Sequence, residues 1–290
     1  MTAAAPLFER VAIIGVGLIG GSVGKALRAH GLAGRVVGVG SGDDTAQALA
    51  LGLIDEGAAD PVAAVAGADL VIVATPVTTV PAIFEAIAPA LAEHALITDC
   101  ASTKGTVVQA AQRWLGAALS RYVAGHPIAG SEHSGPGAAR ADLFAGKRWL
   151  FSPGPQTQAD APERLMALVA RMGARPALLD AGLHDAMFAE YSHAPHALVF
   201  ALCLAVADGP HADQLADLAG AGFKDTTRIG ASSPALWTDI LIDNADETVA
   251  SLQRFAVALA QMSDVLAAGD RAALQSMITR ASAWRADVEK

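Results

Sequence analysis

The chain has 290 residues, of which 53% are hydrophobic and 17% charged, so it can bury a substantial core and disorder is not expected. A formal net charge of −9 argues against nucleic acid as a partner. Two cysteines without C-x-x-C spacing favour a reduced, cytoplasmic setting, and no apolar run approaches the ~20 residues that a membrane span takes.

Residues 1–180 alternate between short apolar runs and helix-like segments. We expect strands at 11–14, 36–39, 70–74, 95–98, 122–124, 149–151 and 177–179, with helices near 18–30, 44–51, 78–92, 103–119 and 161–172. This alternation predicts an α/β fold: a Rossmann-like, doubly wound and mostly parallel sheet with helices on both faces.

After residue 180 the pattern becomes helical, and no strand candidate follows residue 179. Residues 183–207 predict one long helix with a kink or break at Pro195. Further helices are expected near 213–219, 234–244, 247–267 and 272–287. The chain therefore predicts a dinucleotide-binding domain over 1–180 and an all-α domain over 181–290. Because so short a domain cannot cover its own long apolar helices, we expect a homodimer formed through it.

The stretch VAIIGVGLIGGSVGK places G-x-G-x-x-G directly between the first strand and its helix. In such a loop Gly15 permits a tight turn, Gly17 lets backbone approach a pyrophosphate, and Gly20 lets the helix pack closely on the strand. The N–H groups at the helix start, around Leu18 and Ile19, would hold the phosphate charge. The alternative is a structural glycine turn; we favour a dinucleotide site.

Polar residues follow several of the predicted strands. Ser41 follows the second strand, Thr75 and Pro76 follow the third, Ser102 follows the fourth, and His126 ends the fifth. Ligands of an open α/β sheet bind beyond the carboxyl ends of its strands, so these positions are candidate cofactor contacts. A neutral imidazole at residue 126 could accept a proton near physiological pH, or it could only bind loop backbone.

The neighbours of Ser102 have other interpretations. Ser102 and Thr103 could simply cap the next helix. We interpret Lys104 as a surface or phosphate-side charge rather than a base, and Cys100 as a small buried thiol, since no local base pattern would activate it.

The spacing Glu190-x-x-His193-x-x-His196 resembles a metal-binding face. Six residues, however, span ~600° of helix rotation, and Pro195 distorts the helix further. We therefore expect no metal and place His193 and His196 in the lining of an active site, with plain packing as the alternative.

Residues 222–228 form a polar cluster between predicted helices. Arg228 offers a planar fork suited to a carboxylate, and the alternative is a surface ion pair with Asp225 or Glu132. Trp237 could wall a ring-sized pocket or belong to the core.

Six stretches occur in order: GVGLIGGS, DLVIVATPV, DCASTKG, GHPIAGSEHSG, HDAMFAEYSHAPHALVFAL and GFKDTTRI…PALW. With them the chain resembles the prephenate/arogenate (cyclohexadienyl) dehydrogenase family of tyrosine biosynthesis. The resemblance implies NAD(P)-dependent oxidative decarboxylation of prephenate to 4-hydroxyphenylpyruvate, with arogenate or both substrates as the alternative.

The resemblance also implies roles for residues. His126 would take the proton of the substrate's ring hydroxyl, and Ser102 would orient that hydroxyl and the nicotinamide. Arg228 would hold a substrate carboxylate. Four further residues would line the pocket or tune access to it: His193, His196, Trp237 and Glu132, with Asp225 as another possible partner of Arg228.

One departure concerns the cofactor. Gly40 stands where an acidic residue that binds the ribose is expected, so NAD is favoured but NADP is not excluded. We expect no added mutase or regulatory domain, so inhibition by tyrosine, if present, would act at the active site. Two other interpretations are weaker. A β-hydroxyacid dehydrogenase needs a lysine on the helix over 183–207, which has none, and a nucleotide-sensing regulator would not explain His126, His196 and Arg228 together.

Overall fold

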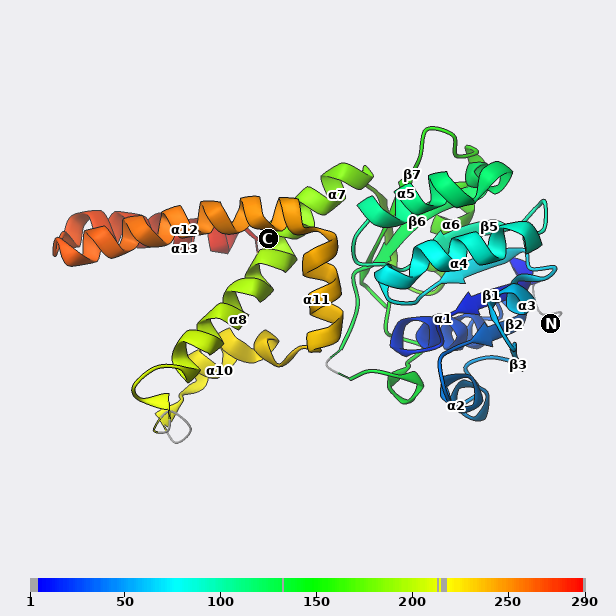
Figure 1. Ribbon diagram of the computed structural model, residues 1–290, viewed down its shortest axis with the longest axis horizontal. Coiled ribbons are helices and arrows are strands. Elements are labelled where there is room, and N and C mark those ends of the chain that lie inside the picture. Colours follow the sequence, from blue (N-terminus) through cyan, green and yellow to red (C-terminus); the bar gives the residue numbers. More distant parts are fainter. Residues whose placement is uncertain (1–4, 132, 213, 215–217, 289–290) are drawn as a thin grey trace.

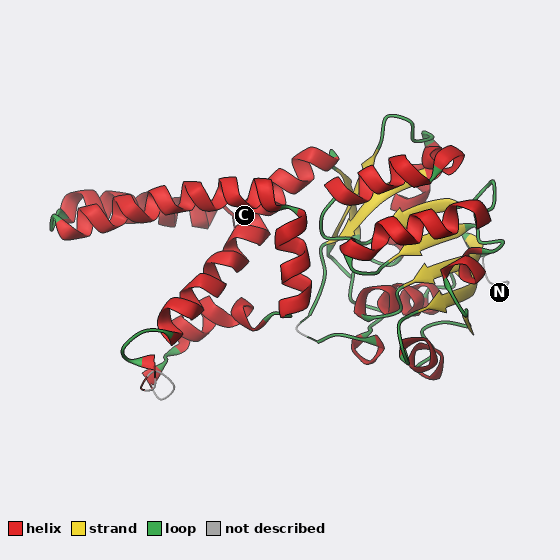
Figure 2. Ribbon diagram, viewed as in Figure 1, coloured by secondary structure: helices red, strands yellow, loops and turns green. Residues whose placement is uncertain are grey.

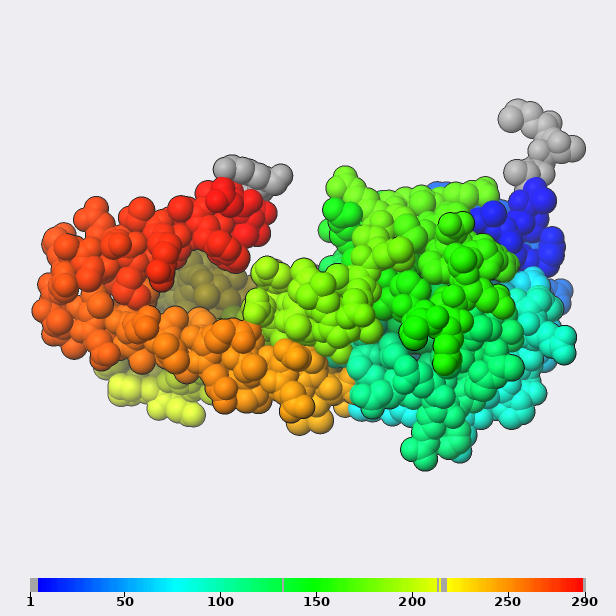
Figure 3. Space-filling view, turned by 90° about the horizontal axis from the view of Figure 1, so that it is seen from above, coloured from blue at the N-terminus to red at the C-terminus, as the bar shows by residue number. Residues whose placement is uncertain are grey.

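A computed structural model describes residues 5–131, 133–212, 214 and 218–288. A sheet with helices on both faces forms one half of the molecule, and an array of helices projects from the end of the sheet (Figure 1). The described strands all lie in the first half (Figure 2). A view from above shows the helical half extending away from the sheet half (Figure 3).

Eight strands form a single sheet in the order β3-β2-β1-β4-β5-β6-β7-β8. Their bounds are β1 Phe8–Ile14, β2 Ala33–Val39, β3 Glu56–Gly57, β4 Leu70–Val73, β5 Leu96–Asp99, β6 Tyr122–Pro127, β7 Arg148–Pro153 and β8 Arg175–Leu178. Neighbouring strands are parallel except for the antiparallel pair β6 and β7. The predicted α/β fold with a mostly parallel sheet is confirmed, and the strand order reverses between β1 and β4.

The helices of the sheet half are α1 Leu18–Ala29, α2 Asp44–Ala50, α3 Pro61–Val65, α4 Val80–Ile87, α5 Gly105–Trp114 and α6 Asp160–Arg171. The very short β3 and α3 were not predicted, because two to five residues show no usable periodicity. The helix expected over 103–119 begins later and ends at Trp114. Gly116, with φ +50°, breaks it, and a 3₁₀ turn over Gly116–Arg121 follows.

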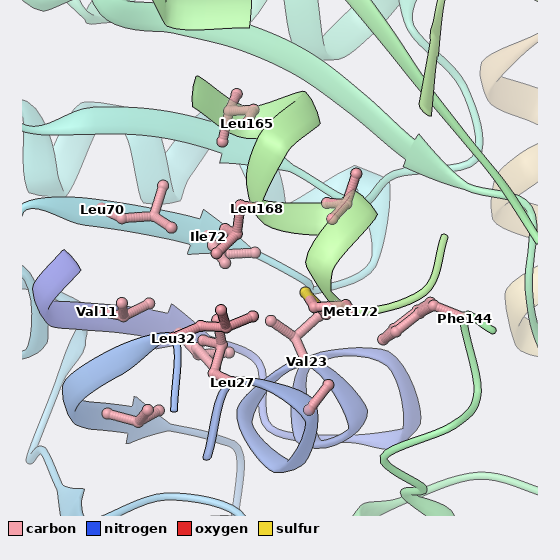
Figure 4. Close-up of a cluster of buried hydrophobic side chains, with 14 of the residues drawn as sticks. Val11, Val23, Leu27, Leu32, Leu70, Ile72, Phe144, Leu165, Leu168 and Met172 are labelled. Atoms are coloured by element: carbon pink, nitrogen blue, oxygen red, sulfur yellow. The ribbon is translucent and has the colours of Figure 1, made fainter. Parts of the chain in front are cut away.

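Two apolar clusters lie on opposite faces of the sheet, because successive strand residues point to opposite sides. In β1, Val11 and Ile13 join the cluster under α1 and α6, while Ala12 and Ile14 join the cluster under α3, α4 and α5. Burying each large apolar side chain contributes about 1.5–3 kcal/mol. The labelled side chains of the first cluster are Val11, Val23, Leu27, Leu32, Leu70, Ile72, Phe144, Leu165, Leu168 and Met172 (Figure 4).

The helical half contains α7 Ala181–Phe188, a π-helical turn Ala189–His193, α8 Ala194–Ala207, α10 Ala221–Thr227, α11 Pro234–Asp243, α12 Ala245–Ala267 and α13 Arg271–Val288. The predicted irregularity of the long helix is present: a π turn ends at His193, and Pro195, which has no N–H to donate to the preceding turn, lies in the first turn of α8. The helix expected over 213–219 includes residues outside the described part.

Residues 222–228 were expected to lie between helices, and this prediction is wrong. The stretch is helical up to Thr227, and a 3₁₀ turn, Arg228–Ala231, follows. The hydroxyls of Thr226 and Thr227 donate to the carbonyls of Gly222 and Phe223, so these polar side chains are satisfied within the helix.

The helical half leaves much apolar surface uncovered. Within its described residues the buried hydrophobic side chains are Ala189, Ala194 and Ile240, whereas Phe255 and Leu259 on α12 are exposed. No described helix is both long and apolar enough to cross a membrane.

Candidate active site

The glycine loop joins β1 to α1 at the point where the strand order reverses. Gly15 has φ +93°, and a Cβ there would stand 2.5 Å from the Ala74 carbonyl oxygen. A Cβ on Gly20 would lie 1.8 Å from the Gly15 carbonyl oxygen, whereas nothing lies within 4 Å of one on Gly17. Leu18 and Ile19 open α1, and no side chain caps its first turn. The loop therefore combines a tight turn, close helix packing and open backbone N–H groups, which is the geometry that a pyrophosphate requires.

The loop after β2 shows why a glycine, and not the expected ribose-binding acidic residue, occupies position 40. A Cβ on Gly40 would lie 2.8 Å from both Val16 Cγ2 and Asp44 Cβ, so a larger side chain does not fit without displacement. Ser41 is exposed, and its hydroxyl donates to Asp44 Oδ2 at 3.1 Å. The nearby carboxylate thus comes from the first turn of α2 instead of from position 40.

Thr75 and Pro76 follow β4, next to the glycine loop. The Thr79 hydroxyl donates to Thr75 Oγ1 at 2.9 Å and lies 2.8 Å from the Pro76 carbonyl oxygen. Across the halves, Thr78 Oγ1 donates to Asp239 Oδ2 of α11 at 3.3 Å. This loop therefore adjoins both the glycine loop and the helical half.

The interpretation of Lys104 as a surface charge is wrong. Its side chain is 1% exposed, and Nζ donates to Asp99 Oδ1 at 2.5 Å and to the Gly125 carbonyl oxygen at 2.6 Å. The Tyr122 hydroxyl donates to the other oxygen of Asp99 at 2.7 Å. Asp99 is itself fully buried, so burying Lys104 beside it pairs two charges that would each be costly alone. The pair fixes the ends of β5 and β6 directly before His126.

His126 lies at the carboxyl end of β6 and is 8% exposed. Its Nδ1 lies 2.8 Å from His184 Nε2, and its ring packs 4.9 Å from that of Phe188. Burial, followed by the nearby charges of His184 and Lys104, holds the pKa of His126 well below its ordinary value. The imidazole is therefore neutral at neutral pH and can accept a proton.

Two residues that the sequence interpretation missed complete this cluster. His184 and Asp185, on α7, were quoted within a matching stretch but had no motif of their own. His184 is fully buried, and its Nδ1 lies 2.7 Å from Asp185 Oδ1. The long sequence separation from His126 hides the contact from any local pattern.

Asp185 also caps α5. Its carboxylate accepts the backbone N–H of Lys104 at 2.8 Å and that of Gly105 at 2.7 Å. The alternative in which Ser102 or Thr103 caps this helix is thus wrong, because the first turn is satisfied from the helical half. Ser102 is half-buried in the loop ahead of α5, and burial raises the pKa of the neighbouring Cys100 thiol.

His193 and His196 lie on opposite sides of Pro195 and have different surroundings. His193 is 1% exposed, its Nδ1 lies 3.0 Å from Asn244 Nδ2, and burial lowers its pKa to about 4. His196 is half-buried, and its Nδ1–H donates to the Ser192 carbonyl oxygen at 2.8 Å. Its ring stacks on Trp237 with centroids 3.4 Å apart. His196 and Trp237 thus form one aromatic wall, with His193 behind it.

Arg228 is exposed at the end of α10. Burial of the His196 ring lowers its pKa, and the positive charge of Arg228 lowers that pKa further. The guanidinium therefore lies near the ring. In the described part of the chain Arg228 forms no ion pair with Asp225. A pocket adjoins this wall, lined by Phe200, Gly230, Ser232, Pro234, Trp237, Thr238 and Leu241.

Two acidic residues remain from the sequence analysis: Glu132, a candidate partner of Arg228, and Glu190, part of the spacing that resembles a metal-binding face. Glu132 lies outside the described residues. Glu190 pairs with Arg254 at 2.5 Å, and the described residues include no cluster of three His, Cys, Asp or Glu side chains that could hold a metal ion.

Comparisons with known proteins cover both halves. A family model described as prephenate dehydrogenase, nucleotide-binding domain, matches residues 23–178, and one described as prephenate dehydrogenase, dimerization domain, matches residues 180–280. The chain is 38% identical to prephenate dehydrogenase of Bacillus subtilis (strain 168) over 247 residues, which cover 82% of this chain and 65% of that protein. The match therefore spans about two thirds of that relative's length.

Two further relatives match over nearly their whole length. Cyclohexadienyl dehydrogenase of Zymomonas mobilis is 33% identical over 269 residues, 91% of this chain and 90% of that protein. The crystal structure of prephenate dehydrogenase from A. aeolicus, in complex with hydroxyphenyl propionate and NAD+, superposes with a TM-score of 0.89 at 30% identity, over 99% of this chain and 100% of that one.

Proposed function

Because the chain belongs to the prephenate dehydrogenase family, we propose that it catalyses the NAD-dependent oxidative decarboxylation of prephenate to 4-hydroxyphenylpyruvate. The observation that carries this proposal is His126, a buried neutral imidazole at the carboxyl end of β6, on the side of the sheet that faces the helical half. Arogenate, alone or together with prephenate, is the alternative substrate, and the cyclohexadienyl dehydrogenase relative keeps it open.

The residues present fit a dinucleotide. The uncapped first turn of α1 and the open position at Gly17 would hold the pyrophosphate, together with Gly15, Leu18, Ile19 and Gly20. Ser41 would contact the adenine ribose, and Thr75, Pro76 and Ser102 would border the nicotinamide. NAD, when bound, accepts a hydride from the ring carbon that carries the substrate hydroxyl.

His126 would remove the proton of that hydroxyl as the hydride leaves the same carbon, so that a carbonyl forms there. Loss of CO₂ then leaves its electron pair in the ring, which becomes aromatic and makes the reaction effectively irreversible. Ser102 would orient the hydroxyl. The chain's contribution is position and proton transfer, and a positioned general base typically accelerates a reaction 10²–10⁴-fold.

The helical half would hold the substrate. We assign a substrate carboxylate to Arg228, which is in none of the ion pairs formed among the described residues. His196 and Trp237 would form the wall against the ring, and His193 would support that wall from behind. Glu132 is retained in the proposal as a residue that tunes access to Arg228.

The domain boundary and the dimer belong to the same proposal. We place the boundary at residue 180, between the end of β8 and the start of α7. The exposed apolar residues of α12 and the matched dimerization domain support a homodimer through the helical half. A monomeric mass in analytical ultracentrifugation at micromolar concentration would contradict it.

One assay tests the reaction. NADH or NADPH formation is followed at 340 nm with prephenate and with arogenate, each against NAD and NADP. We expect the highest kcat/KM with prephenate and NAD. If only arogenate is turned over, arogenate and not prephenate is the substrate. If neither compound is turned over, the proposed function is wrong.

A further inference from the structure

Two hydrogen bonds in series run from His126 into the helical half. His126 Nδ1 lies 2.8 Å from His184 Nε2, and His184 Nδ1 lies 2.7 Å from Asp185 Oδ1. All three side chains are buried, so water does not compete for these bonds. The first bond crosses from the sheet half to the helical half.

The far end of this series fixes the protons along it. Burial alone would raise the pKa of Asp185, but hydrogen bonds from His184, Gly105 and Lys104 outweigh burial and hold that pKa below its ordinary value. Asp185 is therefore a carboxylate, which can only accept hydrogen bonds. The His184 Nδ1 that faces it must then carry a hydrogen and donate it.

The proton on His184 in turn determines which nitrogen of His126 carries a hydrogen. Burial lowers the pKa of His184, so its ring is neutral and the Nε2 is an acceptor. His126 Nδ1 must then donate to it, and in a neutral His126 the remaining nitrogen, Nε2, carries a lone pair. That nitrogen is the one left free to take a proton from a substrate.

We infer that His184 and Asp185 are positioning residues that set the tautomer of His126, so that its Nε2 is the base of the proposed reaction. When the O–H bond of the substrate breaks, its proton goes to Nε2 and its electron pair stays on the oxygen. The His126 ring becomes a cation whose Nδ1–H bond to His184 is charge-assisted, with Asp185 as the counter-charge beyond. This inference rests on the proposed function for the identity of the substrate only.

A purely structural role is the rival explanation, since Asp185 also caps α5 and its carbonyl accepts Asn244 Nδ2 at 2.8 Å. Substitution of His184 distinguishes the structural role from the positioning role, because the α5 cap is formed by the Asp185 carboxylate and does not involve His184. His184→Phe keeps a planar ring but removes both hydrogen bonds. His184→Gln can still accept from His126 through Oε1, so it is the conservative rescue variant.

The direct test is the tautomer itself. ¹⁵N-histidine-labelled protein, without substrate or cofactor, gives one- and two-bond ¹⁵N–¹H couplings that distinguish Nδ1–H from Nε2–H; His126→Asn identifies the signal. We expect His126 as the Nδ1–H form in the wild type and a mixture, or the Nε2–H form, in His184→Phe. An Nε2–H form in the wild type overturns the inference, whether or not prephenate proves to be the substrate.

Kinetics form the second readout. In His184→Phe we expect kcat to fall about 10²-fold or more, while the KM values for substrate and cofactor stay within about threefold of the wild-type values. We expect the kcat of His184→Gln to be at least about tenfold higher than that of His184→Phe. The matched control is His94→Phe, because His94 makes a similar pair with Asp69 at 3.0 Å on the surface. Unchanged kcat in folded His184→Phe, or equal losses in His94→Phe, would overturn the inference.

Discussion

The two halves of the molecule are stabilised in different ways. The sheet half buries an apolar cluster on each face of its strands, and Phe84 and Trp149 are almost completely enclosed there. The helical half buries few apolar side chains among its described residues, but it buries a set of polar ones: His184, Asp185, His193, Asn244, Thr248 and Ser251. The sheet half therefore has an apolar core of its own, whereas the described helical half combines buried polar side chains with exposed apolar ones.

The difference separates two tasks in the site. The proposed base, His126, lies on strand β6, while Arg228 lies in a 3₁₀ turn and Trp237 on α11. We expect substitutions in the sheet core and at His126 to act on folding and on kcat, and substitutions on the exposed face of α12 and at Arg228 to act on dimerisation and on KM. His184 lies in the helical half but contacts His126, so its substitution should act on kcat. Four experiments test this division, starting with the largest expected effect.

A matched pair of truncations compares the two halves directly. Phe84→Ala removes a fully buried ring from the sheet core and should lower the free energy of unfolding by about 3–5 kcal/mol at any protein concentration. Phe255→Ala, at a 43% exposed position on α12, should cost less than about 1 kcal/mol in dilute protein and more at high concentration. Urea unfolding at two concentrations measures both; equal, concentration-independent losses would erase the distinction.

Loss of the base should appear in kcat. His126→Asn retains a polar side chain but cannot accept the substrate proton as a base, so we expect kcat to fall 10²-fold or more. Binding of prephenate, measured by calorimetry, should be nearly kept. Near-normal turnover would remove His126 from the chemistry and leave it as a structural residue of β6.

Loss of the substrate clamp should appear in KM. Arg228→Ala removes a charge-assisted contact of ~2–3 kcal/mol, which corresponds to a rise in KM of roughly 30- to 150-fold with a smaller change in kcat. Arg254→Ala, which removes the exposed partner of Glu190, is the control. An unchanged KM would place the carboxylate elsewhere.

The buried polar side chains of the helical half should respond to acid. The pKa of His193 is about 4 in the folded protein and near 6.5 when unfolded, so between these values the unfolded state binds more protons. The contribution of His193 to stability is therefore present above pH 6.5 and is lost as the pH falls toward 4. His193→Gln keeps an acceptor for Asn244 but does not titrate, and should flatten the decline of unfolding free energy over this range. An equal decline in the variant would assign it to other groups.

The sequence predicted the parts of the site that depend on local spacing. The glycine loop, the strand ends and the break near Pro195 follow from neighbouring residues, and the structure has each of them. It did not predict contacts between distant segments. Nothing around Lys104 indicates that it is buried, because its partner Asp99 becomes buried only when the sheet is covered. His184 and Asp185 were missed for the same reason, since their partners lie on β6 and α5.

The cap on α5 bears on the order in which a newly made chain matures. Gly105 begins the helix, and the carboxylate that caps it is synthesised 80 residues later. The parallel strands β1, β4, β5 and β6 precede that residue and can pair without it. A helix cap contributes typically ~1 kcal/mol, so the loop that carries Ser102 gains its full support only after the second half emerges from the ribosome. A nascent chain can thus pair its central strands well before the loop that carries Ser102 is fully supported.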